Sequence, residues 1–409
     1  MLFLKKQSIK NIKKYSDYLR AIGAFSNLYS SSDKPFIQYR VAENAFCKAF
    51  DAENLARADV AYDAIVNGYG IGIKTFILSG NSKIEKIAEF NSLSSELRKF
   101  KGKELALKLA EFRNNRILFA DRLYDIDKRI YHIVGRDKSV IKIFEVGYDL
   151  LDVGSIKIIS DSKSSLKFKD KFNEYNFNYS KSVLMKRFVV PDDYIEIDVE
   201  IIEDPLELLL ELVKPEIESK TKPVIHPVIK FREETERNTF KLTESKELTP
   251  GIDYVILPLY SPKAKKDNKK LIVPLKSQLN QWNAGGRKRD PGEVYISIPR
   301  IIHKLAPGFL PKKDIIFNLK VPSGEVLNAK VCQSGDKALM TNPNNAMSKW
   351  ILRKVLKLNE GELLDYDKLK LVGYDSVKIT KIKESEYLID FSQLDKYENF
   401  IEKMKEINK

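Results

Sequence analysis

The sequence is poor in cysteine, in histidine and in long apolar runs, and each shortage excludes a class of protein. Its 409 residues include only two cysteines, Cys47 and Cys332, too few for a disulfide framework or a cysteine-based zinc site. No apolar run approaches the roughly 18 residues that a membrane helix requires. The first residues, MLFLKKQSIKNIKK, become lysine-rich without the apolar core of a signal peptide. We therefore expect a cytoplasmic protein with no membrane partner.

Two common nucleotide-binding patterns are also missing. No GxGxxG opens a predicted helix, and the P-loop pattern does not occur. Hydrophobic residues nevertheless make up 43% of the chain, enough for substantial cores. Because the length exceeds that of one ordinary domain, we expect two domains.

Positive charge is in excess and is concentrated in one segment. The chain contains 71 lysines and arginines against 57 acidic residues, a net charge of +14. Residues 261–360 hold 20 basic and 7 acidic residues, a surplus of 13, so the rest is close to neutral. A segment that binds a polyanion concentrates its charge in this way, although a solvated basic face is the simpler alternative.

Apolar spacing predicts an α/β arrangement around a mixed sheet in the first half. We expect a helical lead-in over residues 1–30, helices over 40–56, 82–100 and 103–124, and strands over 70–76, 129–136, 139–148 and 155–161. One further block, residues 173–188, places Ser180, Lys181 and Lys186 among aromatic residues. It is either a contact to a DNA backbone or a closing strand and helix, and we favour the second reading.

The amino-acid composition changes after residue 189, where an acidic stretch interrupted by prolines runs to about residue 250. Beyond it, short strands separated by turn residues indicate a barrel or sandwich. We expect these strands at 253–260, 270–275, 293–299, 314–321, 325–332, 377–384 and 386–391, with one short helix near 348–358. The predicted domains are 1–195, a linking segment 196–250, a second domain 251–395 and a terminal helix 396–409.

The stretch from Ala58 to Phe76 carries the residues best suited to chemistry. Asp59 and Asp63 precede a turn at Asn67 and Gly68, and the strand that follows presents Lys74. A metal-dependent phosphodiesterase needs this order, with a carboxylate to hold a cation and an ammonium to offset charge in the transition state. An ordinary turn and strand produces the same pattern, so the stretch is weak evidence on its own.

The second half resembles a known family. Its blocks SQLNQWNAGGRKRDPGEVYISIPRIIHKLAPGFLP and FNLKVPSGEVLNAKVCQSGDKALMTNPNNAMSKWILR resemble the B3-like DNA-binding pseudobarrel of type II restriction endonucleases. NgoFVII-type enzymes carry such a carboxy-terminal domain, and the EcoRII effector domain is a more distant relative. The resemblance covers about Asp253 to Phe391. In the first half, FCKAF, GIGIKTF and KIAEFN look like blocks of a PD-(D/E)XK nuclease core.

The resemblance implies a restriction-endonuclease-like α/β domain followed by a mostly-β pseudobarrel that clamps the major groove with two arms. Arginine pairs with guanine, asparagine or glutamine with adenine, and aspartate with cytosine. Gly285 and Gly286 would let the backbone approach DNA closely. The arms map onto 277–290 and 336–349, and their candidate contacts are Gln281, Asn283, Arg287, Arg289, Asp290, Lys337, Thr341, Asn342, Asn344, Asn345, Ser348 and Lys349. For each of these, an ordinary loop residue is the alternative.

Two further expectations concern residues near these arms. Trp282 is expected to pack in the core. The lysines expected to attract phosphates without regard to sequence are Lys263, Lys265, Lys266, Lys269 and Lys270.

Histidine patterns exclude two nuclease chemistries. The phospholipase-D-like site that NgoFVII-type enzymes carry needs His-x-Lys, and none of His132, His226 and His303 has lysine two residues later. An HNH site needs clustered histidines, and these three are scattered. Carboxylate and lysine chemistry remains.

In a PD-(D/E)XK site, Asp63 takes the first position and Lys74 the last, but Gly72 stands in place of the second acid. Strand alternation puts Gly72 and Lys74 on one face, so we expect a carboxylate from elsewhere to fill the gap. Glu89, on the predicted following helix, is the first candidate for this carboxylate. Glu43, on the preceding helix, could complete the site by holding metal or water. A solvated helix face is the alternative for both glutamates.

Asp59 is an alternative metal ligand, in which case Asp63 caps the turn. Otherwise Asp63 and Glu89 would hold Mg²⁺. The leading hypothesis is a type II restriction endonuclease acting on double-stranded DNA, for which a homodimer and a cognate DNA methyltransferase are implied partners. The other hypothesis is a DNA-binding protein whose nuclease fold has lost catalysis.

Overall fold

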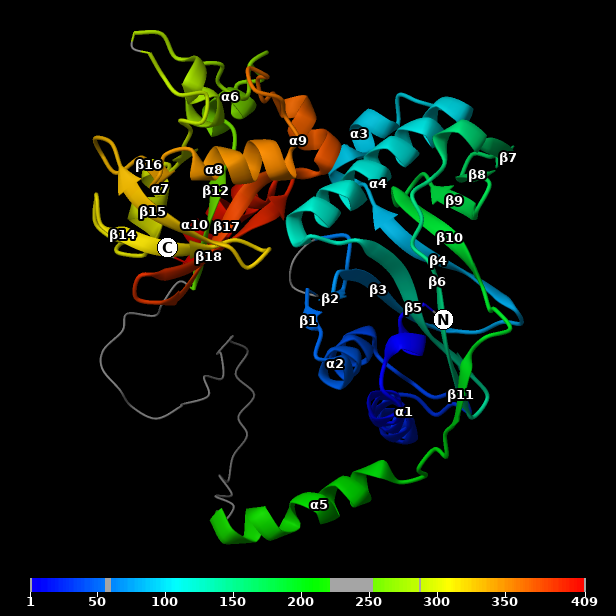
Figure 1. Ribbon diagram of the computed structural model, residues 1–409. Helices are drawn as coiled ribbons and strands as arrows, with labels where there is room; N and C mark the ends of the chain where they lie inside the picture. Colours follow the sequence, from blue (N-terminus) through cyan, green and yellow to red (C-terminus); the bar gives the residue numbers. More distant parts are fainter. Residues whose placement is uncertain (1, 56–59, 221–252, 287, 408–409) are drawn as a thin grey trace, which may run out of the picture.

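The computed structural model describes residues 2–55, 60–220, 253–286 and 288–407, and it has an α/β fold with mixed sheets (Figure 1). Two sheets and most of the long helices belong to the first 198 residues. A third sheet belongs to residues 254–393. Within the described residues, no helix is both long and apolar enough to cross a membrane.

The first sheet, sheet A, carries the stretch singled out above. Its spatial order is β1-β2-β3-β5-β6-β11, with β3 and β5 parallel and the other neighbours antiparallel. The strands span Glu53–Asn54 (β1), Ala64–Val66 (β2), Tyr69–Ile77 (β3), Lys128–Asp137 (β5), Val140–Gly147 (β6) and Ile195–Asp198 (β11). Asn67 and Gly68 both have positive φ, as a two-residue hairpin turn requires, so the predicted turn is confirmed.

Helices α1 (Ile9–Ala24) and α2 (Tyr39–Phe50) cover one face of sheet A, and both confirm predicted helices. Ser8 caps α1 by accepting a hydrogen bond from the Asn11 amide. Phe46 of α2 packs in one buried cluster with Ile71 and Ile73 of β3. The apolar residues of α2 therefore place this helix directly against the strand that carries Lys74.

The second sheet, sheet B, is antiparallel and was not anticipated as a separate sheet. Its order is β4-β10-β9-β8-β7, and the strands span Ser82–Glu89 (β4), Val183–Val189 (β10), Glu174–Asn178 (β9), Ser165–Lys169 (β8) and Lys157–Asp161 (β7). The helix predicted over 82–100 is wrong for its first eight residues. They pair with β10, about a hundred positions later, and such tertiary pairing overrides local helix propensity. Only η3 (Asn91–Leu93) and α3 (Ser94–Leu97) are helical there.

The third sheet, sheet C, is barrel-like and nearly closed. Its order is β12-β17-β18-β14-β15-β16-β13, and its two end strands contact each other. The strands span Tyr254–Pro258 (β12), Tyr374–Lys383 (β17), Glu386–Gln393 (β18), Ile316–Lys320 (β14), Val326–Cys332 (β15), Ala338–Thr341 (β16) and Ile296–Ser297 (β13). This arrangement is consistent with the predicted pseudobarrel.

Several local predictions for the second half are wrong. Residues 270–275 form no strand; Val273 is buried, and Pro274 has no amide for a ladder. Strand β16 was missed. More than one helix is present: α6 (Pro262–Lys266), η5 (Gln278–Asn283), α7 (Arg300–Leu305), α8 (Ala346–Ser348), η6 (Lys349–Val355), α9 (Tyr366–Val372) and α10 (Lys396–Ile407). In the predicted linking segment, β11 continues sheet A to Asp198, and α5 spans Pro205–Lys220.

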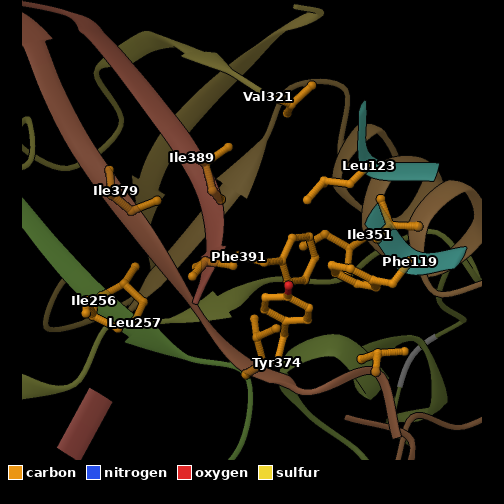
Figure 2. Close-up of a cluster of buried hydrophobic side chains, with 14 of the residues drawn as sticks. Phe119, Leu123, Ile256, Leu257, Val321, Ile351, Tyr374, Ile379, Ile389 and Phe391 are labelled. Atoms are coloured by element: carbon orange, nitrogen blue, oxygen red, sulfur yellow. The ribbon is translucent and has the colours of Figure 1, made fainter. Parts of the chain in front are cut away.

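Helix α4 (Gly102–Tyr124), which confirms a predicted helix, joins the two halves. Figure 2 shows its Phe119 and Leu123 packed among Ile351, Tyr374 and Phe391 of the second half. The Phe119 ring stacks on Tyr374 with centroids 4.6 Å apart, and it meets the Phe391 ring edge-on at 4.9 Å. These aromatic contacts bury the surface between helix α4 and sheet C.

Polar contacts surround this apolar centre. The Tyr124 hydroxyl donates to Asp390 at 3.1 Å. Burial raises the pKa of Asp390 to about 6. At the other edge, Lys370 pairs with Glu96 at 3.5 Å. The interface therefore combines an aromatic core with polar pairs around it.

Replacing Phe119 by alanine should destabilise the protein by about 3–5 kcal/mol, because it empties the aromatic centre of the interface. Denaturant unfolding measures this change. The matched control is Phe172→Ala, since the Phe172 ring is 56% exposed, and it should cost less than about 0.5 kcal/mol. Equal unfolding midpoints for the two variants would show that α4 does not hold the halves together.

Candidate functional site

Asp63 and Lys74 lie close together at the point where β2 no longer pairs with β3. Asp63 immediately precedes β2, and Lys74 lies on β3. The Asp63 amide donates to the Ile71 carbonyl, and the Asp63 carboxylate accepts a hydrogen bond from the Ile73 amide at 2.7 Å. The Lys74 ammonium lies 3.8 Å from the same carboxylate. The short β2 strand thus fixes Asp63 against β3, and the two residues predicted from the sequence pattern are brought together.

Glu43, on helix α2, lies near enough to this pair for the charges of Asp63 and Lys74 to affect its carboxyl group. Its side chain is only 4% exposed, and its Oε2 atom is buried without a hydrogen-bond partner. Burial, and secondarily the charge of Asp63, raises the pKa of Glu43 to about 7, against the opposing effects of Arg40 and Lys74. The solvated helix face considered for Glu43 is therefore wrong. Its unpaired oxygen calls for an explanation, and a bound ion or water is one.

Cys47 lies one helical turn after Glu43 and was not picked out from the sequence. Burial, and then the charges of Glu43 and Asp63, raises the pKa of its thiol to about 11. The spacing of four residues on one helix was the signal that would have placed it beside Glu43. A thiol with so high a pKa stays protonated, so Cys47 acts as a neutral neighbour of the carboxylates.

Gly72 is closely covered by aromatic rings. A Cβ atom there would lie 2.9 Å from the Tyr131 ring and 3.0 Å from the Tyr148 ring. These two rings stack on each other with centroids 3.9 Å apart. The expectation that another carboxylate fills the space beside Gly72 is wrong, because the tyrosines already occupy it.

Glu89 lies in sheet B and not in the cluster. It ends strand β4, its carboxylate bonds to Lys86, and its carbonyl accepts from Arg116 at 2.8 Å. The structure does not bring it within hydrogen-bonding distance of Asp63, Lys74 or Glu43. Asp59 lies outside the described residues, so its role as the alternative ligand stays a prediction.

The donor set allows a restricted kind of metal binding. Among the described residues, no group of three or more histidines, cysteines, aspartates and glutamates is arranged to hold a metal ion. Glu43 and Asp63 nevertheless supply two neighbouring carboxylates, one with an unused buried oxygen. Mg²⁺ commonly keeps several waters and is held by one or two carboxylates, so these residues fit Mg²⁺ better than an ion that needs a full protein cage.

A second charged cluster lies between sheets A and B. Lys186 is 3% exposed, donates to the Gly147 carbonyl at 3.0 Å and lies over the Tyr131 ring. Burial, and secondarily Arg113, lowers the pKa of Lys186 to about 8. It borders a pocket of about 490 Å³ that Asp149 also lines. Residues 174–178 and 183–189 are strands β9 and β10, so the structural reading holds for Lys186; the accompanying helix is absent, and Ser180 and Lys181 are exposed.

Two residues of the first predicted DNA arm are held by Glu293, an acid that was not identified from the sequence. Gln281 and Arg289 both donate to the Glu293 carboxylate, at 3.3 Å and 3.2 Å. Asn283 and Asp290 are exposed, although Asp290 also accepts from the Gly292 amide at 2.7 Å. Arg287 lies outside the described residues. An acidic residue only three positions after a basic arm was the signal for Glu293.

The second predicted arm divides into buried and exposed residues. Thr341 ends strand β16, is fully buried and accepts from the Met347 amide at 3.0 Å. Ser348 is buried and donates to the Asn345 carbonyl at 3.0 Å. The structure thus places Thr341 and Ser348 inside the domain, and Asn345 is half-buried. The solvent-facing candidates of this arm are Lys337, Asn342, Asn344 and Lys349.

The two arms lie side by side. A Cβ atom at Gly292, just after the first arm, would be 2.6 Å from Cβ of Asn345 and 3.1 Å from Oγ of Ser348. Trp282 is partly buried and packs against the main core, as expected. The exposed polar residues of both arms therefore belong to one region of the domain.

The expectation that Lys265 contacts phosphates is wrong, because three acidic residues of the second half surround its ammonium group. Although burial opposes it, the charge of Asp375 raises the pKa of Lys265, whose ammonium lies 3.3 Å from that carboxylate and 2.9 Å from Asp395. It also pairs with Glu398 at 3.2 Å. Lys265 is an internal ion-pair partner. The other four predicted phosphate contacts are exposed: Lys263, Lys266, Lys269 and Lys270.

Comparison with known families agrees with this picture of the second half. Residues 260–383 match the family described as the NgoFVII C-terminal B3-like DNA-binding domain. No curated protein matches the chain. The second half therefore contains a B3-like DNA-binding domain, of the kind found at the carboxy terminus of a restriction enzyme. The predicted resemblance is confirmed for this half, and double-stranded DNA is the partner that it supports.

Glu43→Gln should stabilise the metal-free protein at high pH. The pKa of Glu43 rises from its ordinary 4.5 to about 7 on folding. Folding therefore favours the protonated acid, and the stability of the unmodified protein falls as pH rises through this window. Glutamine does not ionise, so its stability does not fall in this way. In EDTA the free energy of unfolding of the variant should equal that of the unmodified protein below pH 4.5 and exceed it by roughly 1–3 kcal/mol above pH 7.

Chemical unfolding at pH 4.5 and pH 8 measures this difference, with Glu325→Gln as the control because Glu325 is exposed. The control should show no pH-dependent gain. A Glu43→Gln variant that is less stable at pH 8 would mean that the buried carboxylate is satisfied by a contact beyond those described.

Asn344→Ala and Lys349→Ala should separate base reading from phosphate binding. If Asn344 reads a base edge, its loss costs about 1–3 kcal/mol on a duplex selected from a random pool and leaves random DNA unaffected. Lys349→Ala should weaken binding to both duplexes equally and reduce the salt slope by about one. Titrations at several salt concentrations distinguish them, with exposed Asn318→Ala as control. Equal losses on both duplexes for Asn344→Ala would make it a phosphate contact.

Proposed function

We propose that the protein is a type II restriction endonuclease that hydrolyses phosphodiester bonds in double-stranded DNA with Mg²⁺. One observation carries the proposal. Glu43 on α2, Asp63 just before β2 and Lys74 on β3 lie near one another, in a chain whose second half contains a DNA-binding domain of restriction-enzyme type. Convergent carboxylates with a perturbed pKa and a nearby lysine are expected of a hydrolytic site.

Each of the three residues has a definite task in this proposal. Asp63 and Glu43 would hold Mg²⁺, which supplies Lewis acidity and a more acidic water when bound. Lys74, whose ammonium lies 3.8 Å from the Asp63 carboxylate, offsets negative charge as it develops on the phosphoryl oxygens and orients the attacking water. The Ile73 amide keeps Asp63 in one orientation at 2.7 Å.

The chemistry of the step follows the resemblance to PD-(D/E)XK enzymes. A water oxygen forms the new bond to phosphorus as the bond to the 3′ oxygen breaks. The products are a 5′-phosphate and a 3′-hydroxyl. Because Glu43 holds a proton up to about pH 7, it must lose this proton before it can bind a cation. The rate should therefore rise with pH through the neutral range.

The remaining parts of the proposal concern the setting of the reaction. One such site cuts one strand, so two copies of the chain would cut a duplex, and a homodimer is the assembly we propose. A cognate DNA methyltransferase would protect the host's own sites in the cytoplasm. These partners follow from the type of enzyme proposed.

A DNA-binding protein without catalysis is the second candidate function. It is favoured by Gly72, where the Tyr131 and Tyr148 rings exclude the usual second acid. It is also favoured by the absence, within the described residues, of a cluster of three or more metal ligands. In that case the first half would serve assembly or recruitment.

Cleavage assays decide between the two candidates. Long unmethylated duplex DNA should give discrete fragments with Mg²⁺ and none with EDTA. Lys74→Met should lower the rate by about 100-fold or more, since it removes the cation that offsets transition-state charge. The control is Lys138→Met, an exposed lysine between β5 and β6, which should cut normally. Sequence-specific binding with no cutting under any condition would rule out the nuclease.

A further inference from the structure

We propose that Tyr62, Asp121 and Arg122 connect the second DNA-binding arm to Asp63, so that recognition of DNA positions this candidate catalytic carboxylate. The proposal rests on the proposed function where it treats Asp63 as catalytic. The three residues touch no reacting atom, and they are positioning residues. The connection is built from contacts in three consecutive parts of the fold.

The first part joins the arm to a helix. The exposed Asn342 and Asn344 are followed at once by α8 and η6, which form continuous helical structure over residues 346–355. Thr341 accepts from the Met347 amide at 3.0 Å and so fastens the end of β16 to the helix. A π-helical segment such as η6 is common at functional sites in helices. A displacement of the arm is therefore transmitted along this helix.

The second part joins this helix to α4. The Val355 carbonyl, in the last turn of η6, accepts from Nε of Arg122 at 2.6 Å. Its neighbour Lys354 pairs with Asp125 at 2.9 Å, just beyond the end of α4. Between these ends, Ile351 packs beside Phe119 and Leu123 (Figure 2). Two polar contacts and a packed apolar surface thus couple the carboxy-terminal end of α4 to η6.

The third part joins α4 to the candidate site. Asp121, adjacent to Arg122, accepts a hydrogen bond from the Tyr62 hydroxyl and lies 3.5 Å from Arg129. Tyr62 is the residue immediately before Asp63. Its ring is 1% exposed and covers Gly70, where a Cβ atom would lie 2.6 Å from it. The ring has almost no room to move by itself, so a shift of α4 displaces the backbone that carries Asp63.

A small shift of the Asp63 carboxylate would be sufficient to change the cleavage rate. Asp63 is held by one amide hydrogen bond of 2.7 Å from Ile73 and lies 3.8 Å from Lys74. A misplacement of about 1 Å in a catalytic group can cost about 100-fold in rate. Contiguous packed side chains and hydrogen bonds are the usual carriers of such coupling. The chain would thereby link cutting to correct recognition.

Hydrogen exchange at the Ile73 amide tests the connection without any need for cleavage. This amide donates to Asp63, so its exchange rate reports directly on the candidate carboxylate. The probe is a duplex selected from a random pool, added in EDTA. In the unmodified protein, binding of this duplex should slow exchange at Ile73 by about fivefold or more, the lower end of typical coupling.

Two variants break the connection at different points. Tyr62→Phe removes only the hydroxyl that Asp121 accepts, and Arg122→Met removes the donor to Val355 while keeping a long side chain. Each should bind the selected duplex with an affinity within about twofold of normal and lose the protection at Ile73. The control is Tyr179→Phe, whose hydroxyl donates to Asp161 in sheet B, and it should keep the protection. Exchange at Val134 of β5 without DNA detects general loosening, which would mark a merely structural effect.

The outcomes are separable from those of the proposed function. Full protection at Ile73 in both variants, or none in the unmodified protein on binding DNA, overturns the connection. Protection that depends on Tyr62 and Arg122 in a protein that never cuts DNA supports the connection and rejects the nuclease. Where cleavage does occur, both variants should cut the selected duplex roughly 10–100-fold more slowly at unchanged affinity.

Discussion

The packing of Phe119 between Tyr374 and Phe391 is the contact on which the arrangement of the molecule depends. It lies on α4, which reaches sheet B at one end and sheet C at the other (Figures 1 and 2). A stacked ring and an edge-on ring are worth more than their buried area alone. The polar pairs around it, Tyr124 with Asp390 and Lys370 with Glu96, also join the two halves. The DNA-binding domain and the Asp63 region therefore keep a fixed position relative to each other.

The candidate site lowers the stability of the fold, because it contains a buried carboxylate. Glu43 is buried beside Asp63 with an oxygen that no group satisfies, and its raised pKa measures the unfavourable charge. An unsatisfied buried polar atom calls for an explanation, and a functional role is one of the explanations. Lys74 relieves part of this cost from the strand side. In the proposed nuclease a bound cation would relieve the rest, and the packing of α2 against β3 offsets the cost in the folded protein.

Much of the outline could be predicted from the chain alone, and the errors have physical causes. The pairing of Asp63 with Lys74 followed from a turn and an alternating strand, both local features. Glu89 was misplaced because β4 pairs with β10, which no local pattern reveals. Lys265 was misread as a surface charge because three distant acids surround it. The buried state of Glu43 likewise depends on where α2 packs.

By itself, the sequence determined the basic, short-stranded second half, the restriction-type DNA-binding domain and the stretch that holds Asp63 and Lys74. Those features depend on composition, on strand spacing and on neighbours close in the chain. Tertiary structure alone decided that Glu43 joins the pair, that two tyrosines cover Gly72, and that Tyr62 meets Asp121. These depend on side chains brought together from remote segments, and burial then changes their charge. The stretch around Asp63 and Lys74 therefore became a candidate site only through helix α2, which packs against β3.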